Sequence, residues 1–185
     1  IGNRVVFIQE QGSVVRDLGY KFDEDVYTGS DLTILATHLF RNHRILDMCY
    51  QREPQSVIWC VRDDGVLLGM TYLKEQEVWA WHRHDTDGCF ESVSSIAGQT
   101  RNELWAVVRR TIGGNTKRFI ERLSESVPSQ VPAEQTHLDC FLTYRGAATS
   151  TISGLGHLEG KSVVALADGA VVDNLTVVGG AITLP

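Results

Sequence analysis

The chain has 185 residues, 43% of them hydrophobic and 22% charged, which is the composition of an ordinary folded protein of one or two domains and excludes a disordered chain. Its formal net charge of −6 argues against the basic surface with which most nucleic-acid-binding proteins hold phosphates. It contains no apolar run of about 18 residues, so we expect no membrane-spanning helix.

The cysteines and the first residues bear on the cellular setting. The four cysteines contain no Cys-x-x-Cys pair, which argues against zinc ribbons and redox motifs; they are Cys49, Cys60, Cys89 and Cys140. We expect buried free thiols in a reducing compartment. The chain starts at Ile1 without an initiator Met or a signal-peptide pattern, so we expect it to be a piece of a longer protein.

The first fifty residues predict a hairpin, a helix and a strand. Residues 4–9 and 14–22 alternate around Gly12, as the two strands of a hairpin do. Residues 30–40 predict one short helix, which Ser30 or Asp31 would cap. Residues 45–51 return to a strand pattern.

The middle of the chain predicts consecutive antiparallel strands. Apolar runs are separated by short turn sequences such as Asp63-Asp64-Gly65, in which both Asp and Gly tolerate positive φ. The expected strands are residues 57–62, 66–73, 78–84, 89–96, 103–112 and 116–123. Such a meander is not stable alone, so it must bury its faces against neighbouring sheets.

A strand that runs into a tight hairpin recurs at nearly one period. Trp59 lies 52 residues after Phe7, and Trp105 lies 46 residues after Trp59. A period of about 40–50 residues made of short strands is typical of β-propeller blades. We therefore interpret residues 1–125 as a partial β-propeller-like region of antiparallel sheet repeats, too short to close a ring by itself. Trp59 and Trp105 would then be core residues, and replacing either with Ala would cost roughly 3–5 kcal/mol.

The composition changes after residue 125. Residues 126–135 contain two prolines and no periodicity, which is typical of a linker. Residues 136–185 contain many glycines between short apolar runs, which predicts a small β-barrel or sandwich module. Its expected strands are residues 138–144, 162–167, 170–172, 175–178 and 181–184. The fold class is therefore mainly β.

Few side chains suggest chemistry. The nearest approach to a metal site is His82 and His84 on one strand face, with Cys89 from the next strand and Asp85 or Asp87 as a fourth ligand. We favour packing of the two imidazoles beside the tryptophans over metal binding. Residues 63–65 and 85–88 are read as hairpin turns, because their spacing is too short for an EF-hand. No Gly-x-Ser-x-Gly motif is present, and we expect no catalytic, cofactor-binding or metal-binding residues.

A distinctive string occupies residues 50–88, with Tyr50-Gln51-Arg52-Glu53-Pro54-Gln55-Ser56-Val57-Ile58-Trp59 near its start and Val78-Trp79-Ala80-Trp81-His82-Arg83-His84 near its end. This string resembles tail proteins of bacteriophages and prophages, of the tail-hub or nozzle type found at the tail tube of short-tailed phages. Residues 138–184 look like the small β-module that follows in those proteins.

The resemblance implies a structural virion protein without enzymatic activity or cofactor. It would form part of an oligomeric ring around the DNA exit channel, in contact with other tail or portal-adaptor proteins. Phage DNA would pass through an acidic lumen without specific binding. The protein would be found in the virion tail, and in the cytoplasm of the bacterial host during assembly. A tail-tip module that binds a receptor or glycan is the alternative, and a hydrolase or metal-dependent enzyme ranks last.

Overall fold

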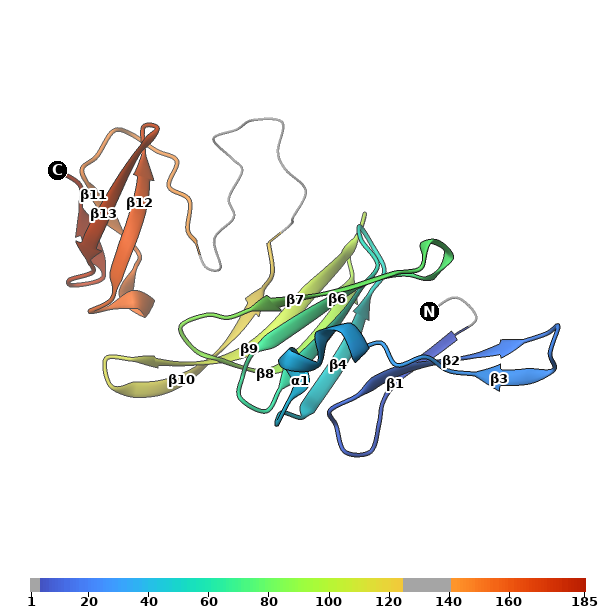
Figure 1. Cartoon of the computed structure of the whole chain (residues 1–185). Coiled ribbons are helices and arrows are strands. Elements are labelled where there is room, and N and C mark those ends of the chain that lie inside the picture. Colours follow the sequence, from blue (N-terminus) through green and yellow to red (C-terminus); the bar gives the residue numbers. More distant parts are fainter. Residues whose placement is uncertain (1–3, 125–140) are drawn as a thin grey trace. The chain divides into compact units, whose positions relative to one another are not determined.

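The computed structural model describes residues 4–124 and 141–185, and it is mainly β, with several antiparallel sheets and one short α-helix (Figure 1). The chain divides into two compact units. The first comprises residues 1–109 and 118–123, and the second comprises residues 110–117 and 124–185. The expected linker, residues 126–135, lies outside the described residues.

Three antiparallel sheets follow one another along residues 4–122, each with its strands in chain order. Sheet A consists of β1 (Arg4–Ile8), β2 (Val15–Lys21) and β3 (Val26–Thr28). Sheet B consists of β4 (Ile45–Gln51), β5 (Val57–Arg62), β6 (Leu67–Leu73) and β7 (Val78–His84). Sheet C consists of β8 (Cys89–Ala97), β9 (Asn102–Ile112) and β10 (Asn115–Arg122). The sequence predicted these strands closely, with the exception of β3.

The helical segment is shorter than residues 30–40. It comprises the 3₁₀ turn η1 (Ile34–Ala36) and the helix α1 (Thr37–Phe40). The backbone before it pairs with β2 instead, because the Leu32 amide donates to the Val15 carbonyl over 2.9 Å. The carboxylate of Asp31 accepts from the amide and hydroxyl of Thr33. Residues 30–32 therefore extend sheet A, and the helix begins only after this local turn. A second 3₁₀ turn, η2 (Lys74–Gln76), joins β6 to β7.

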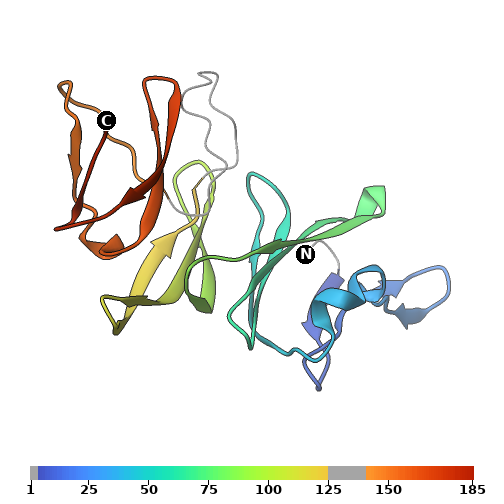
Figure 2. The same ribbon diagram turned by 60° about the vertical axis from the view of Figure 1, so that its left-hand side comes forward.

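Sheet B lies in the middle of the first unit and is covered on both faces (Figure 2). All six residues of β5 are buried, although successive side chains of a strand point to opposite faces. Ile58 and Cys60 belong to one hydrophobic cluster, whereas Val57, Trp59 and Val61 belong to another. A strand that alternates between two cores is apolar at every position, which explains the unbroken run Val57–Val61.

The first cluster packs sheet A and the helical segment against sheet B. Its buried members come from both sides, with Val15 from β2, Phe40 from α1 and Leu68 from β6. The ring of Trp81 meets Phe40 edge to face at 4.7 Å between centroids. The indole N–H of Trp81 donates to the Leu32 carbonyl over 2.7 Å. β7 is thereby joined to the segment that leads into the helix.

The second cluster packs sheet C against the other face of sheet B. Trp59 and Leu67 of sheet B meet Leu104 and Val108 of β9 in this cluster. The Val93 amide of β8 also donates to the Asp47 carboxylate over 2.9 Å. Sheets A, B and C are therefore stacked in chain order, with two separate hydrophobic layers between them.

The second unit has its own small core. β11 (Thr151–Ser153) pairs with β14 (Ala181–Thr183), and β12 (Ser162–Ala167) pairs with β13 (Ala170–Thr176). A 3₁₀ turn, η4 (Gly156–Leu158), precedes β12. Leu155, Val177 and Ile182 form the buried cluster.

Two predictions for this module were wrong in detail. Residues 170–172 and 175–178 were expected as two strands, but one strand, β13, spans most of both. Its partner β12 carries a register shift between Val163 and Ala165, which allows the pairing to continue. Residues 141–144 are not a strand, and residues 138–140 lie outside the described part. Among the sheets that the structure describes, none closes into a barrel.

None of the helices in residues 4–124 and 141–185 is long and apolar enough to cross a membrane.

Candidate functional site

The two histidines singled out in the sequence lie together on β7. His82 Nδ1 and His84 Nε2 are 2.8 Å apart, which is a hydrogen-bond distance. Both rings also contact the indole of Trp59, with centroids 5.5 and 5.2 Å away. Gly69 makes this packing possible, because a Cβ at that position would lie 2.1 Å from the His82 ring. The predicted packing of the imidazoles beside a tryptophan is therefore present.

Cys89 is not joined to these histidines. It begins β8 and lies against the turn at Gly65, where an added Cβ would come within 2.5 Å of the Cys89 Cβ. Among the described residues, no third ligand atom gathers with the two imidazoles to form a metal-binding group. Asp85 pairs instead with the Arg83 guanidinium over 3.0 Å. Tetrahedral zinc would hold two imidazole nitrogens about 3.3 Å apart, wider than the hydrogen bond between them.

Burial affects the protonation of His82. Removal from water lowers the pKa of His82 below its ordinary value, and the neighbouring His84 lowers it further. The neutral imidazole is therefore the stable form in the folded protein near neutral pH. A neutral ring is able to donate or accept the hydrogen bond to His84 and to pack against Trp59.

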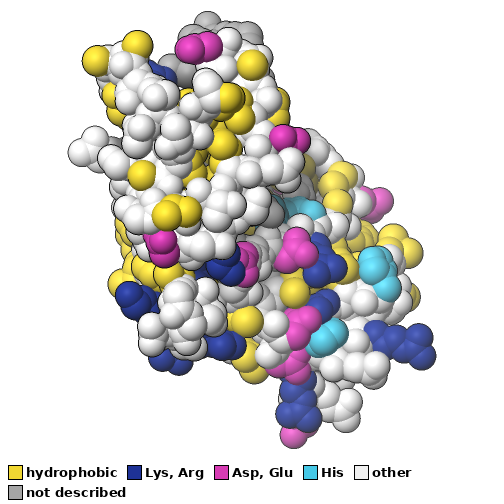
Figure 3. Space-filling model, turned by 90° about the vertical axis from the view of Figure 1, so that its left-hand side faces the viewer, with side chains coloured by type: hydrophobic (Ala, Val, Ile, Leu, Met, Phe, Trp, Pro, Cys, Tyr) yellow, Lys and Arg dark blue, Asp and Glu magenta, His cyan; other side chains and the backbone are white. Residues whose placement is uncertain are grey.

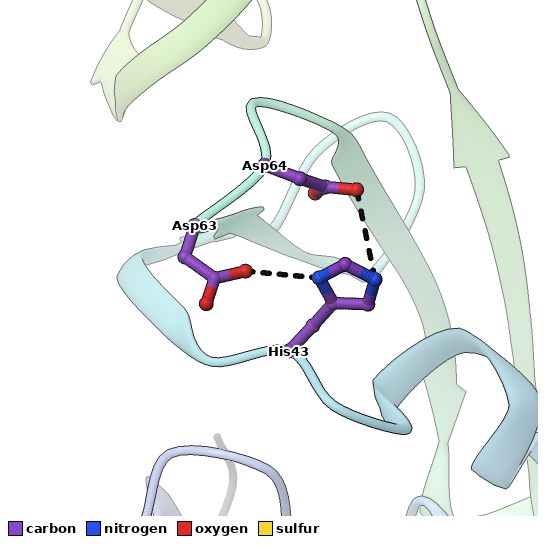
Figure 4. Close-up of side chains that lie close together, drawn as sticks. All are labelled: His43, Asp63 and Asp64. Carbon is purple, nitrogen blue, oxygen red and sulfur yellow. Dashed lines mark hydrogen bonds and ion pairs between the residues drawn. The ribbon is translucent and has the colours of Figure 1, made fainter.

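Three other side chains form the one described group with metal-ligand chemistry: His43, Asp63 and Asp64 (Figure 4). His43 Nδ1 is 3.0 Å from the Asp63 carboxylate, and its Nε2 is 3.8 Å from the Asp64 carboxylate. Figure 4 shows the imidazole between the two carboxylates, which lie on the turn between β5 and β6.

The charge of Asp64 is already balanced by Arg62. The Arg62 guanidinium donates to both Asp64 oxygens, and its Nη1 also donates to the Leu39 carbonyl over 2.6 Å. The hydrogen bond from Arg62 lowers the pKa of Asp64, and the hydrogen bond from His43 lowers the pKa of Asp63. The group therefore links the end of α1 to the β5–β6 turn. A divalent metal ion would have to compete with the Arg62 guanidinium, which is already bound to the Asp64 carboxylate.

His43 was not predicted as a member of this group. Asp63-Asp64-Gly65 was predicted to be a hairpin turn, and the structure confirms that turn: the Arg62 amide donates to the Val66 carbonyl, and the Gly65 amide donates to the Arg62 carbonyl. His43 lies 20 residues before Asp63, with no motif spacing to link them. Strand pairing was the signal that could have found His43. The register of β4 with β5 places Ile45 opposite Arg62, and this brings the loop before β4 beside the turn that follows β5.

A buried carboxylate that the sequence analysis did not single out links three elements. Asp17 of β2 is fully buried, and it accepts hydrogen bonds from the Ser30 amide (2.7 Å), the Tyr72 hydroxyl (3.0 Å) and the Arg4 guanidinium (2.8 Å). Lys74 lies 3.8 Å away. Burial by itself would raise the pKa of Asp17, but these donors and cations outweigh it and lower the pKa.

The thiols differ in their surroundings. Cys60 is fully buried in the cluster between sheets A and B, and Cys49 packs partly buried against the cluster between sheets B and C. Burial, with a smaller contribution from Asp47, raises the pKa of the Cys49 thiol to about 12. Cys89 is half-buried, and the three described cysteines are free thiols. Cys140 lies outside the described residues.

No protein-family model matches this chain, and no curated protein matches it significantly.

Proposed function

We propose that this chain is a structural component of a bacteriophage tail, of the hub or nozzle type, and that it forms part of a ring around the DNA exit channel. The resemblance in residues 50–88 supports this proposal. Those residues form β5, β6 and β7 with the end of β4, so the distinctive string makes up most of the central sheet of the stack.

The observation that carries the proposal is the stack itself. Sheet B is a four-stranded antiparallel meander in chain order, which is the topology of one propeller blade. Sheets A and C, each a three-stranded meander, pack on its two faces as neighbouring blades do. A wall of blades that twist relative to one another curves around an axis, and further blades from outside this chain would complete the ring. The small second unit would then be a barrel-like module that contributes subunit contacts.

The polar clusters around Asp64 and Asp17 support the proposal of a rigid wall, because they connect separate elements. The Arg62–Asp64 pair holds the end of α1 to a turn of sheet B, and Asp17 holds sheet A to Tyr72 of sheet B. These groups bond to one another across elements, so they hold the layers in register.

An acidic lumen is part of the proposal. On the face drawn in Figure 3, acidic and basic side chains are interspersed. A lumen that repels DNA needs one sign of charge over a continuous wall, so a different face would have to line the channel. The neighbours would be other tail or portal-adaptor proteins, with the protein in the virion tail and, during assembly, in the host cytoplasm.

Immunogold electron microscopy tests this function. Phage particles induced from the source strain are labelled with antibody raised against the purified chain, with pre-immune serum as the control. We expect gold at the tail tip and peptides of the chain in purified particles. Unlabelled particles, with the protein free in the lysate, would contradict a tail component.

The alternative, a receptor- or glycan-binding module, is favoured by one observation. Tyr20, Phe22 and Tyr27 expose their rings close together on the β2–β3 hairpin, with ring centroids 6.4 and 5.2 Å apart. Aromatic faces of this kind stack on sugars. Binding on a glycan array that is lost in a Tyr27→Ala variant would support this alternative.

A further inference from the structure

His82 and His84 lie on the face of sheet B that packs on sheet C. The registers of β5 with β6 and of β6 with β7 place Trp59, Gly69 and His82 in one row across the sheet, and residues directly opposite one another in an antiparallel pair share a face. Trp59 belongs to the hydrophobic layer between sheets B and C. Both imidazoles contact its indole, with ring centroids 5.5 and 5.2 Å away. The two histidines therefore border this layer.

The hydrogen bond between the two rings limits how many protons they hold. A neutral imidazole has one N–H group and one nitrogen with a lone pair, whereas an imidazolium has two N–H groups. The contact joins His82 Nδ1 to His84 Nε2 over 2.8 Å, so one of these nitrogens donates and the other accepts. With one added proton, the pair still has one nitrogen that is able to accept. With two added protons, all four nitrogens carry hydrogen, and the contact joins two N–H donors of two cations.

The surroundings of the pair tolerate one charge better than two. An aromatic ring attracts a cation, so the contact with Trp59 is compatible with a single imidazolium. Two imidazolium rings in contact repel each other, and His82 is half-buried, where water screens the repulsion only in part. Burial, and then the neighbouring His84, lower the pKa of His82 below its ordinary value, as this argument requires.

The titratable groups on the far edge of sheet B do not offset this repulsion. Cys49 lies opposite Trp59 on β4, and burial raises the pKa of its thiol to about 12, so the thiol stays neutral in acid. Asp47 on the same strand accepts a hydrogen bond from the Val93 amide. β4 and β7 are the two edge strands of sheet B, so three strand spacings, roughly 14 Å, separate these groups from the histidines.

The charged groups on the other neighbouring elements have partners elsewhere. On β7 itself, Arg83 points to the other face of the sheet and pairs with Asp85 over 3.0 Å. Cys89 of β8 lies against the turn between β5 and β6. Three further charged residues each have an interaction partner: Asp87 in the loop after β7, Arg110 on β9 and Glu121 on β10. Among the described residues, His84 is the one group whose charge acts on His82.

We propose that the His82–His84 pair makes the packing of sheet C on sheet B sensitive to acid, because uptake of a second proton breaks the hydrogen bond between the rings and loosens the layer around Trp59. The inference rests on this pair and its layer and does not depend on the proposed tail function.

The direction of the pH effect follows from the two states of the chain. The unfolded chain binds protons at both rings near the ordinary histidine pKa of about 6.5, whereas the folded chain binds the second proton only at a lower pH, since the pKa of His82 is lowered. The stabilisation that the neutral pair provides is therefore fully present above about pH 6.5 and decreases as the pH falls below that value. The contribution of Asp17 is lost only below about pH 4, so the two effects occupy different pH ranges.

Urea denaturation between about pH 7.5 and about pH 5 tests the proposal. Below about pH 6.5, the unfolding equilibrium constant of the unmodified chain should rise by up to about tenfold per pH unit, because the unfolded chain binds one more proton. His82→Gln should remove most of this rise, since an amide donates and accepts hydrogen bonds but binds no proton. His38→Gln is the matched control and should keep the rise, because His38 is an exposed histidine on α1. The same pH dependence in all three proteins would overturn the proposal.

Titration of the imidazole rings by NMR gives a second test that needs no variant. At the pH at which the exposed His38 ring is half protonated, the His82 ring should still be mostly neutral. A His82 ring that takes up its proton together with His38 would overturn the proposal, whether or not the His82→Gln variant folds.

Amide hydrogen exchange shows which layer loosens. The Val93 amide donates across the layer from sheet C to Asp47 of sheet B, and the Leu32 amide donates to the Val15 carbonyl within sheet A. After correction for the intrinsic effect of pH on exchange, acid should lower the protection of Val93 more than the protection of Leu32. Equal loss of protection at both amides, or loss at Leu32 alone, would overturn the assignment of the effect to the layer between sheets B and C.

Discussion

Asp17 shows how one buried charge holds several elements in place. Its carboxylate receives hydrogen bonds from β1, from the segment before the helix and from β6, through Arg4, Ser30 and Tyr72. These three parts of the chain are distant in sequence. A fully buried carboxylate is tolerated because donors and cations surround it.

Replacing Asp17 with Ala should lower the free energy of unfolding by about 3 kcal/mol, because the Ser30 amide and the Tyr72 hydroxyl lose their acceptor. Urea denaturation at pH 7 measures this loss. Asp23→Ala, on an exposed turn of the same sheet, is the control and should change little. Equal stability of the two variants would contradict the role assigned to Asp17.

The pH dependence of stability should also change in the Asp17→Ala variant. The pKa of Asp17 is lower in the folded chain than the ordinary value of 3.8. The unfolded chain therefore binds a proton first as pH falls, so the stabilisation is present above about pH 4 and is lost below it. As the pH falls below about 4, the unmodified protein should lose stability more steeply than the variant.

The His82 ring packs directly over Gly69, so the space for this ring depends on the absence of a side chain at position 69. A Cβ at position 69 would overlap the His82 ring, which packs against both Trp59 and His84. We expect Gly69→Ala to cost about 1–3 kcal/mol, the usual cost of overpacking. Adding His82→Ala should recover part of the loss, because the overlapping ring is gone. A double-mutant cycle in urea measures this coupling, and strictly additive effects would contradict it.

At the scale of elements, β5 and β9 explain why two tryptophans at similar hairpin positions are not equivalent. Trp59 is 5% exposed within the layer between sheets B and C, and its indole N–H donates to Gln51. Trp105 lies between Leu104 and Ala106, which face that same layer, so its own side chain points to the other face of sheet C. Trp105 is half-buried and donates to Glu103 over 3.0 Å.

The prediction that both tryptophans are core residues is therefore correct for Trp59, which is buried, but not for Trp105, which is only half-buried. Trp59→Ala should cost about 3–5 kcal/mol, as large core aromatics do. Trp105→Ala should cost about 1 kcal/mol, because it loses one hydrogen bond and partial packing. Thermal unfolding of the two variants measures the difference. Equal and large losses would show that sheet C is covered on both faces in solution.

At the scale of the whole molecule, the two units have cores with no shared residue among those described. Ile58 lies in the first unit, between sheets A and B, whereas Val177 lies in the small cluster of the second unit. We expect each unit to unfold in a separate cooperative transition, because residues that pack in the same core unfold together.

Calorimetry of two truncation variants checks this independence. Val177→Ala should cost about 2 kcal/mol and lower only one transition, and Ile58→Ala should cost about 2–5 kcal/mol and lower only the other. Both residues are almost fully buried, so each change leaves a cavity in one core. A single transition that both variants lower would show that the units unfold together.

The sequence by itself determined most of the strands and turns. β4, β5 and β7 match their expected bounds, and the turn at Asp63-Asp64-Gly65 is present. Alternation and turn chemistry act over a few residues, so local sequence is sufficient to specify them. The mainly β class follows from the same signals.

Only the tertiary structure decided which faces meet. The helix begins late because residues 30–32 pair with β2, and Trp105 points away from the layer that holds Trp59. His43 reaches Asp63 through the pairing of β4 with β5, and Cys89 stays apart from His82 and His84. These outcomes depend on contacts between residues distant in sequence. A local pattern records that a face is apolar, but the partner that covers the face is set by the packing of whole sheets.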